Sequence, residues 1–158
     1  MKALVVSDTH GKTKGLVALL ERYGGQVSTV IHLGDYCRDL TDCKGDYPHL
    51  EMVTVAGAVD YGHEPVVSLT AHGRKVLMVH GHAHNVKESM STLVNLAFRE
   101  KADVCLFGHT HFQTMYRDEG ILFMNPGSLS EPRGSRIAGY GLLEITPTGE
   151  IKAEVLPL

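Results

Sequence analysis

The chain has 158 residues, a formal net charge of −3 at pH 7, and 43% hydrophobic and 21% charged residues. This length is sufficient for one domain with a buried core, and the mixed surface charge gives no sign of a strong nucleic-acid binder. There is no 18-residue apolar run, and no signal-peptide pattern precedes the first apolar segment. We therefore expect a single domain over residues 1–158, no membrane contact and a cytoplasmic location.

Three cysteines, Cys37, Cys43 and Cys105, form an odd set without the C-x-x-C spacing of a structural zinc site. Free thiols of this kind are typical of a reducing compartment.

The N-terminal segment predicts a strand followed by a helix. Residues 3–6 are a continuous apolar run, as expected for a central strand that is covered on both faces. Apolar residues three and four positions apart then predict a helix that begins after Thr13 and ends at Gly24. Because Thr13 is the better N-cap, Asp8 and His10 at the end of the strand are free for another role.

Two further strands are predicted at residues 29–33 and 51–56, with one short helical turn near Leu40 between them. His32 lies inside the first of these strands, so we interpret it as a packed or hydrogen-bonded core histidine and not as a metal ligand. Asp35 follows that strand, and a polar turn with Asp60 follows the next one. We expect Asp60 to hold its own turn.

The second half of the chain predicts three hairpins and one helix. The hairpins are expected at residues 66–79, 114–124 and 139–156, each around a glycine-containing turn. The first hairpin leads directly into His80 and His82. Apolar spacing predicts the helix over residues 86–100.

A short strand at residues 104–107 ends at Gly108, which we expect to turn the backbone sharply, and His109 and His111 follow. Side chains at positions i and i+2 leave extended or turn backbone on the same side, whereas on a helix they would diverge. A lone histidine after a strand is usually a surface residue. A Gly-His-x-His pair at a strand end instead favours metal binding.

Several strands therefore end in a residue able to bind a metal ion. Two carboxylates and four imidazoles are too many for one tetrahedral zinc site, but they suit two adjacent divalent ions that share a carboxylate. Oxygen and nitrogen ligands without cysteine suit Mn²⁺, Fe²⁺, Zn²⁺, Ni²⁺ or Co²⁺. The six candidate ligands are Asp8, His10, Asp35, His80, His109 and His111.

These motifs occur in the order seen in the calcineurin-like metallophosphoesterase superfamily, which the chain resembles over essentially its whole length. The short chain and the sequence 125–128 (Asn-Pro-Gly-Ser) resemble the small YfcE-type phosphodiesterase branch. The motifs that carry the resemblance are Asp8-x-His10, Gly34-Asp35, Gly57-x-x-Asp60, His80-Gly81-His82 and Gly108-His109-x-His111.

The resemblance implies an α/β fold, a four-layer α/β/β/α sandwich with a dinuclear site at one edge of its two sheets. By position, Asp8, His10 and His111 would hold one metal ion, His80 and His109 the second, and Asp35 would bridge them. Mn²⁺ is the favoured metal.

The same resemblance implies a phosphodiesterase in which a hydroxide between the two ions attacks phosphorus. In such an enzyme Asp35 and His109 would serve catalysis. Its substrate would be a small phosphodiester, and a homo-oligomer is possible. His82 and Arg133 are the candidate substrate contacts, although His82 could instead only support His80 and an exposed arginine such as Arg133 is usually just solvated. Two other classes stay open: a non-catalytic binding scaffold of the same fold and a mononuclear metal hydrolase.

The chain departs from the family at one position. The family turn has Asn, a ligand of the second metal ion that also touches the phosphoryl group, where this chain has Ala58. Val59 likewise stands where many members have a proton-donating histidine. Ala58 has three interpretations: a deliberate inactivating substitution, a naturally weakened site, or a protein that has abandoned catalysis for binding. We favour the first, because the other candidate ligands are all present.

Overall fold

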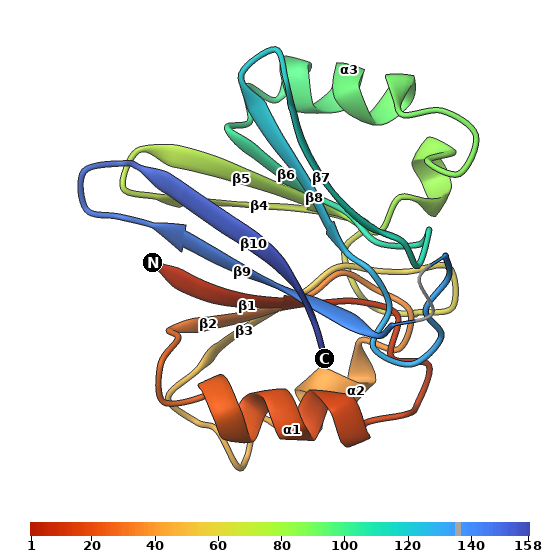
Figure 1. The fold of residues 1–158 in the computed structure, drawn as a ribbon, viewed down its shortest axis with the longest axis vertical. Helices are drawn as coiled ribbons and strands as arrows, with labels where there is room; N and C mark the ends of the chain where they lie inside the picture. Colours follow the sequence, from red (N-terminus) through yellow and green to blue (C-terminus); the bar gives the residue numbers. More distant parts are fainter. Residues whose placement is uncertain (135–136) are drawn as a thin grey trace.

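The computed structural model describes residues 1–134 and 137–158. Two five-stranded sheets pack face to face, with α1 and α2 on the outer face of one sheet and α3 on the outer face of the other (Figure 1). The expected four-layer α/β/β/α sandwich is therefore confirmed.

The first sheet combines the N-terminal strands with the C-terminal hairpin. β1, β2 and β3 are parallel, whereas β9 is antiparallel to both β1 and β10. In spatial order the strands are β10 (Ile151–Pro157), β9 (Gly139–Ile145), β1 (Lys2–Val6), β2 (Thr29–His32) and β3 (Glu51–Thr54).

The second sheet is built from the middle of the chain. β5, β6 and β8 are parallel, and an antiparallel strand closes each edge. In spatial order the strands are β4 (Val66–Ala71), β5 (Arg74–Val79), β6 (Val104–Leu106), β8 (Ile121–Pro126) and β7 (Gln113–Asp118).

The apolar runs of the sequence reflect burial on both faces of each sheet. Along β1, Ala3 and Val5 pack into the core between the two sheets, whereas Leu4 and Val6 pack against the helices of the first sheet. Because successive side chains of a strand point to opposite faces, such a strand is apolar at every position.

The helices agree with the sequence except for the start of α3. They are α1 (Lys14–Tyr23), α2 (Arg38–Thr41), the 3-10 helix η1 (His82–His84) and α3 (Ser91–Arg99). Thr13 is the N-cap of α1 as expected, but its side chain makes no capping hydrogen bond. The helix predicted from residue 86 begins only at Ser91, because η1 and a turn with the left-handed Asn85 precede it.

Three predicted strands are shorter than expected at their C-terminal ends, since β2, β3 and β6 end at His32, Thr54 and Leu106. Conversely, the second arm of the hairpin expected to end at residue 124 continues through Asn125 and Pro126, which belong to β8.

This topology brings the polar loops together. The carboxyl ends of parallel neighbours lie at the same edge of a sheet, and the loops that follow β1, β2, β5 and β6 gather opposite the β9–β10 turn (Figure 1). No helix within the described ranges is long and apolar enough to span a membrane.

Candidate metal centre

The six candidate ligands lie in two adjacent groups at the seam between the sheets. In each group the potential ligand atoms lie within 4.8 Å of one another. One group contains Asp8, His10 and His111, and the other contains Asp35, His80 and His109. The histidines at positions 109 and 111 thus face neighbouring groups. The partition agrees with the one that the sequence resemblance implies, and the ligand roles themselves stay a prediction.

Asp8 presents one oxygen to the site and uses the other to hold its own position. Its Oδ2 accepts hydrogen bonds from the Ser7 hydroxyl at 2.6 Å and from the His109 backbone N–H at 3.2 Å. Its Oδ1 is buried without a hydrogen-bond partner among the described residues and lies 3.1 Å from His111 Nε2. That oxygen is therefore free to bind a cation.

Two backbone carbonyls fix the tautomers of His80 and His111. The Nδ1 atom of His80 lies 2.7 Å from the Leu33 carbonyl oxygen, and Nδ1 of His111 lies 2.7 Å from the Glu131 carbonyl oxygen. A carbonyl only accepts, so each Nδ1 must donate. Each neutral ring then carries its lone pair on Nε2, inside the site. This second hydrogen bond is typical of metal-binding histidines.

Asp35 stands between the two groups. Its Oδ1 accepts the Ala58 backbone N–H at 2.7 Å. Its Oδ2 lies 3.5 Å from His80 Nε2 in its own group and 3.8 Å from His10 Nε2 in the other. One carboxylate oxygen is thus within reach of both clusters, which is the position that a bridging ligand requires.

The charges of the site shift several pKa values. Burial raises the pKa of Asp35, but hydrogen bonding and attraction from His80 more than offset it and hold the carboxylate well below its usual range. Burial likewise raises the pKa of Asp8, but the interactions of its carboxylate with His111 and His80 lower it further than burial raises it. Burial lowers the pKa of His80, and the carboxylates of Asp35 and Asp8 raise it further than burial lowers it. Both carboxylates are therefore ionised at neutral pH.

His109 differs from its neighbours. Burial, together with repulsion from His80 and Lys87, lowers the pKa of His109 to about 4. Its imidazole is therefore neutral over the whole physiological range, which is the form that binds a metal ion.

The residues present fit divalent cations. Besides Asp8 Oδ1, the Nε2 atom of His80 is buried without a hydrogen-bond partner among the described residues. Unpaired buried polar atoms are costly, so two of them 3.9 Å apart indicate a position that suits a cation. The donors are carboxylate oxygens and imidazole nitrogens, which suit borderline and hard divalent metals.

Five of the six candidate ligands have a left-handed backbone conformation. The φ angles of Asp8, His10, Asp35, His109 and His111 are 54°, 48°, 56°, 67° and 61°. This conformation costs a residue with a side chain on the order of 1–2 kcal/mol, and such strain concentrates at functional sites. Tight left-handed turns at the strand ends, not extended backbone, therefore direct these side chains inward.

Two glycines allow the loops to approach each other. A Cβ at Gly108 would overlap Ser7 Oγ, and a Cβ at Gly57 would overlap the backbone and carboxylate of Asp35. Gly108 does not have a positive φ. Close approach of the Ser7 loop, and not a sharp left-handed turn, is therefore what requires glycine at Gly108.

The structure confirms the interpretation of the two supporting residues. Asp60 accepts backbone N–H groups of Gly57, Tyr36 and Cys37 at 2.8, 3.0 and 2.9 Å, and so fixes its turn. His32 is fully buried, and its Nδ1 accepts the Gly34 N–H at 3.2 Å.

The remaining candidates lie at the rim. The ring centroid of His82 lies 5.4 Å from that of His80 and 6.1 Å from that of His109. Arg133 is exposed, and its backbone N–H donates to the His111 carbonyl at 3.1 Å. Ala58 is exposed beside Asp35 and offers a methyl group and its backbone atoms only.

Ser128 was expected to shape a turn near the site, whereas Ser130 and two backbone carbonyls that hold the site were missed by sequence reasoning. The Ser128 and Ser130 hydroxyls both donate to the Asp8 carbonyl, at 2.7 and 3.0 Å. The Leu33 and Glu131 carbonyls orient imidazoles through backbone atoms that every residue possesses. No side-chain signal in the sequence could have identified these two carbonyls.

The fold and these groups define an α/β protein with a candidate carboxylate–imidazole metal centre at the seam of two stacked mixed sheets. The sequence model of the calcineurin-like phosphoesterase superfamily domain matches residues 1–148, and the chain belongs to that family.

Individual relatives agree with this assignment. The probable metallophosphoesterase YsnB of Bacillus subtilis (strain 168) is 34% identical over 151 residues, which covers 92% of this chain and 85% of YsnB. The phosphodiesterase YfcE of Escherichia coli (strain K12) is 32% identical, over 91% of this chain and 88% of YfcE. A crystal structure of a predicted phosphoesterase from Streptococcus pneumoniae superposes with a TM-score of 0.80 at 29% identity, over 99% of this chain and 88% of that one.

Proposed function

We propose that this chain is a phosphodiesterase that uses two divalent metal ions, with Mn²⁺ favoured, and that Ala58 weakens the second metal site. The observation that carries the proposal is the position of Asp35 Oδ2, which lies within 3.8 Å of imidazole nitrogens from both ligand groups. The name of the relative YfcE supports a phosphodiester as the substrate class.

In this proposal Asp8, His10 and His111 hold one ion, His80 and His109 hold the other, and Asp35 is shared. When bound, two such ions supply positive charge to phosphoryl oxygens and lower the pKa of bound water. The protein's own contribution is to keep both carboxylates ionised and to hold the imidazoles in one tautomer. Both effects fix the ligand atoms before substrate arrives.

The residues beside the second group favour reactive substrates. Ala58 and Val59 carry a methyl and an isopropyl group, so neither can donate a proton to a leaving oxygen. A reaction without such a donor depends on the acidity of the leaving alcohol. Aryl diesters should therefore be hydrolysed better than alkyl diesters, with His82 and Arg133 as candidate substrate contacts.

The role of Ala58 can be tested by restoring a ligand. Ala58→Asn should add an amide oxygen next to the second group, since Ala58 is exposed and its N–H already contacts Asp35. Losing even an outer partner of a metal ligand costs roughly 10- to 100-fold in affinity or activity, and we expect a gain of at least that order. Val59→Asn is the matched control, because it adds the same amide one residue away.

Metal content per chain and hydrolysis of bis(p-nitrophenyl) phosphate are measured at limiting and saturating Mn²⁺. A gain at limiting metal alone would assign the defect to affinity, and a gain that persists at saturation would assign it also to the transition state. If Ala58→Asn gains no more than the control, the weakened-site proposal is wrong. One metal ion per chain in every variant would favour a mononuclear hydrolase, and absence of turnover in all of them would favour a binding scaffold.

A further inference from the structure

A cavity of about 580 Å³ lies beside the loop that carries His109 and His111. This volume is within the range of pockets that bind small molecules. Thr110, which stands between the two histidines, forms part of its wall. The cavity therefore begins where the proposed metal centre ends. Its other lining residues include Val86, Lys87, Met90, Phe107, Phe112 and Arg133.

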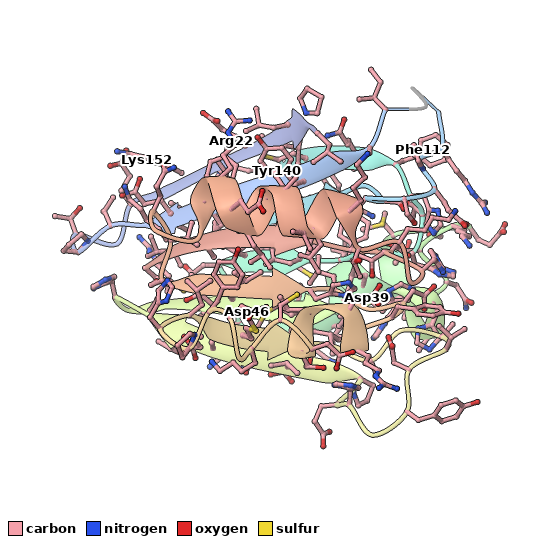
Figure 2. The ribbon with its side chains drawn as sticks, turned by 90° about the horizontal axis from the view of Figure 1, so that it is seen from below. Arg22, Asp39, Asp46, Phe112, Tyr140 and Lys152 are labelled. Atoms are coloured by element: carbon pink, nitrogen blue, oxygen red, sulfur yellow. The ribbon has the colours of Figure 1, made fainter. Side chains whose placement is uncertain are left out.

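Four of the residues that line the cavity are apolar and pack at different depths. Phe107 and Val86 are buried, and Met90 is half-buried. Phe112 is 47% exposed, and its ring lies so close to Gly134 that a Cβ there would overlap it. Its backbone N–H also donates to Thr110 Oγ1 at 3.1 Å. Figure 2 shows Phe112 at the loop end of the molecule, opposite Lys152. An aromatic face held in this way suits a flat substrate group.

Two cations stand at the rim. Lys87 and Arg133 are exposed, and neither side chain has a hydrogen bond or ion pair with another described residue. Both line the cavity together with Thr110, and the backbone N–H of Arg133 donates to the His111 carbonyl at 3.1 Å, which places this cation next to the proposed metal centre. In a chain with a net charge of −3, two unpaired cations around one cavity form a local site for an anion.

We propose that this cavity binds one ester arm of the substrate, and that Lys87 and Arg133 select arms in which an aromatic body carries an additional anionic group. The inference rests on the proposed phosphodiesterase function and names its substrate class. The scissile phosphoryl group faces the metal centre, the aromatic body lies against Phe112, and the second anion lies between the two cations. The guanidinium of Arg133 can bind a carboxylate or phosphate through two parallel hydrogen bonds.

Binding of three phosphonates to the Mn²⁺-loaded protein tests this directly by calorimetry. The probes are methylphosphonate, 4-carbamoylphenylphosphonate and 4-carboxyphenylphosphonate. The aryl probes should bind more tightly than the methyl probe, and the carboxylate should add a further factor of roughly 5 to 10, as expected of two partly exposed ion pairs. The double variant Lys87→Gln/Arg133→Gln should remove the carboxylate preference, and Phe112→Leu should reduce the aryl preference.

The matched control is Lys101→Gln/Arg117→Gln, which removes one lysine and one arginine that do not line the cavity. It should keep the carboxylate preference. Equal affinities for the carboxy and carbamoyl probes in the parent, or a preference that survives in the Lys87/Arg133 double variant, would overturn the inference.

Turnover separates this inference from the proposed function. The p-nitrophenyl diesters of 4-carboxyphenol and 4-carbamoylphenol release the same p-nitrophenolate, so their ratio of kcat/KM reports the retained arm alone. Hydrolysis of both at equal rates would leave the phosphodiesterase standing and refute the cavity's selectivity. Charge-selective binding of the phosphonates without hydrolysis of any diester would support the cavity and refute the phosphodiesterase.

Discussion

The buried imidazole of His32 should make the protein acid-labile by a calculable amount. Burial lowers its pKa to about 4, although the carboxylates of Asp8, Asp60 and Asp39 pull in the opposite direction. Its hydrogen bonds explain why the ring stays neutral. The Nδ1 atom accepts the Gly34 N–H, so Nε2 must carry the proton and donate to Thr9 Oγ1 at 3.0 Å. A proton on Nδ1 would face another N–H.

The sign and size of the effect follow from linkage. Above the ordinary histidine pKa of about 6.5 both folded and unfolded states are neutral at His32, and the residue adds no pH dependence. Below it, the unfolded state binds a proton that the folded state refuses until about pH 4. Stability is therefore lost as the pH falls, by about 2 kcal/mol between about pH 7 and about pH 5 and by about 3 kcal/mol at about pH 4.

The assay compares the parent with His32→Gln, whose amide can donate and accept but cannot titrate. Free energies of unfolding in urea are measured across this pH range with a chelator present, so that metal binding does not contribute. The substitution itself adds an offset that does not depend on pH, while the difference between the two proteins should shrink by about 2 kcal/mol toward about pH 5. Two parallel curves would refute the assignment of a neutral buried His32.

Three further predictions concern the metal centre. Asp35→Asn should lower both metal content and diester hydrolysis by at least 10-fold, because the carboxylate that it removes faces both ligand groups. Two tightly bound metal ions and full turnover in this variant would exclude a bridging role for Asp35. Mn²⁺ affinity should fall as the pH drops through about 6.5, because protons compete with the metal ion for the imidazoles. His80 and His111 should be protonated first, since their pKa values are raised. Excess Mn²⁺ should move the acid limb of the activity profile to lower pH, and an acid limb that does not respond to Mn²⁺ would contradict this. In metal-free protein, the free energy of unfolding in urea should be about 1 kcal/mol higher for His10→Gly than for His10→Ala, because only alanine is strained at φ 48°. Equal stabilities of the two variants would show that the turn relaxes.

The fold was predictable because central strands such as β1 and β6 are apolar on both faces. The runs at β1, β2 and β6 could not be surface strands, and the order of strand-end motifs indicated which ends meet. The start of α3 was not predictable in the same way. Val86 is buried and Met90 is half-buried, so they continue the apolar spacing of the helix, although the left-handed Asn85 shows that the preceding chain is a turn. Periodicity reports which residues are buried, not whether the backbone between them is helical.

The identity of the candidate ligands could be predicted from the sequence, but the backbone geometry that brings them together could not. Residue type and order identified Asp8, Asp35 and His109, but the left-handed turns that aim them were not evident, since aspartate and histidine adopt positive φ only where the surroundings impose it. The cavity beside Phe112 was also not evident. The cavity is lined by residues of the segment between η1 and α3, of the loop that carries His109 and of the loop at Arg133. Only the folded chain brings these segments together.

Asp8 explains how the site can keep its geometry without a cation. Its carbonyl accepts the Ser128 and Ser130 hydroxyls, and its Oδ2 accepts Ser7 and the backbone N–H of His109. These bonds tie the first sheet to loops that follow β6 and β8 of the second. They also fix Oδ1, which is buried without a hydrogen-bond partner among the described residues and faces the Nε2 atoms of His111 and His80 at 3.1 and 3.9 Å.

A buried acceptor without a partner costs about 1–3 kcal/mol, and more when it is charged. The folded chain therefore holds Oδ1 in place at the expense of its own stability. A divalent cation that binds there removes this cost without requiring the loops to move. Because the unfolded chain has no such preformed group, cation binding must stabilise the folded state, and it does so increasingly as the metal concentration exceeds the dissociation constant.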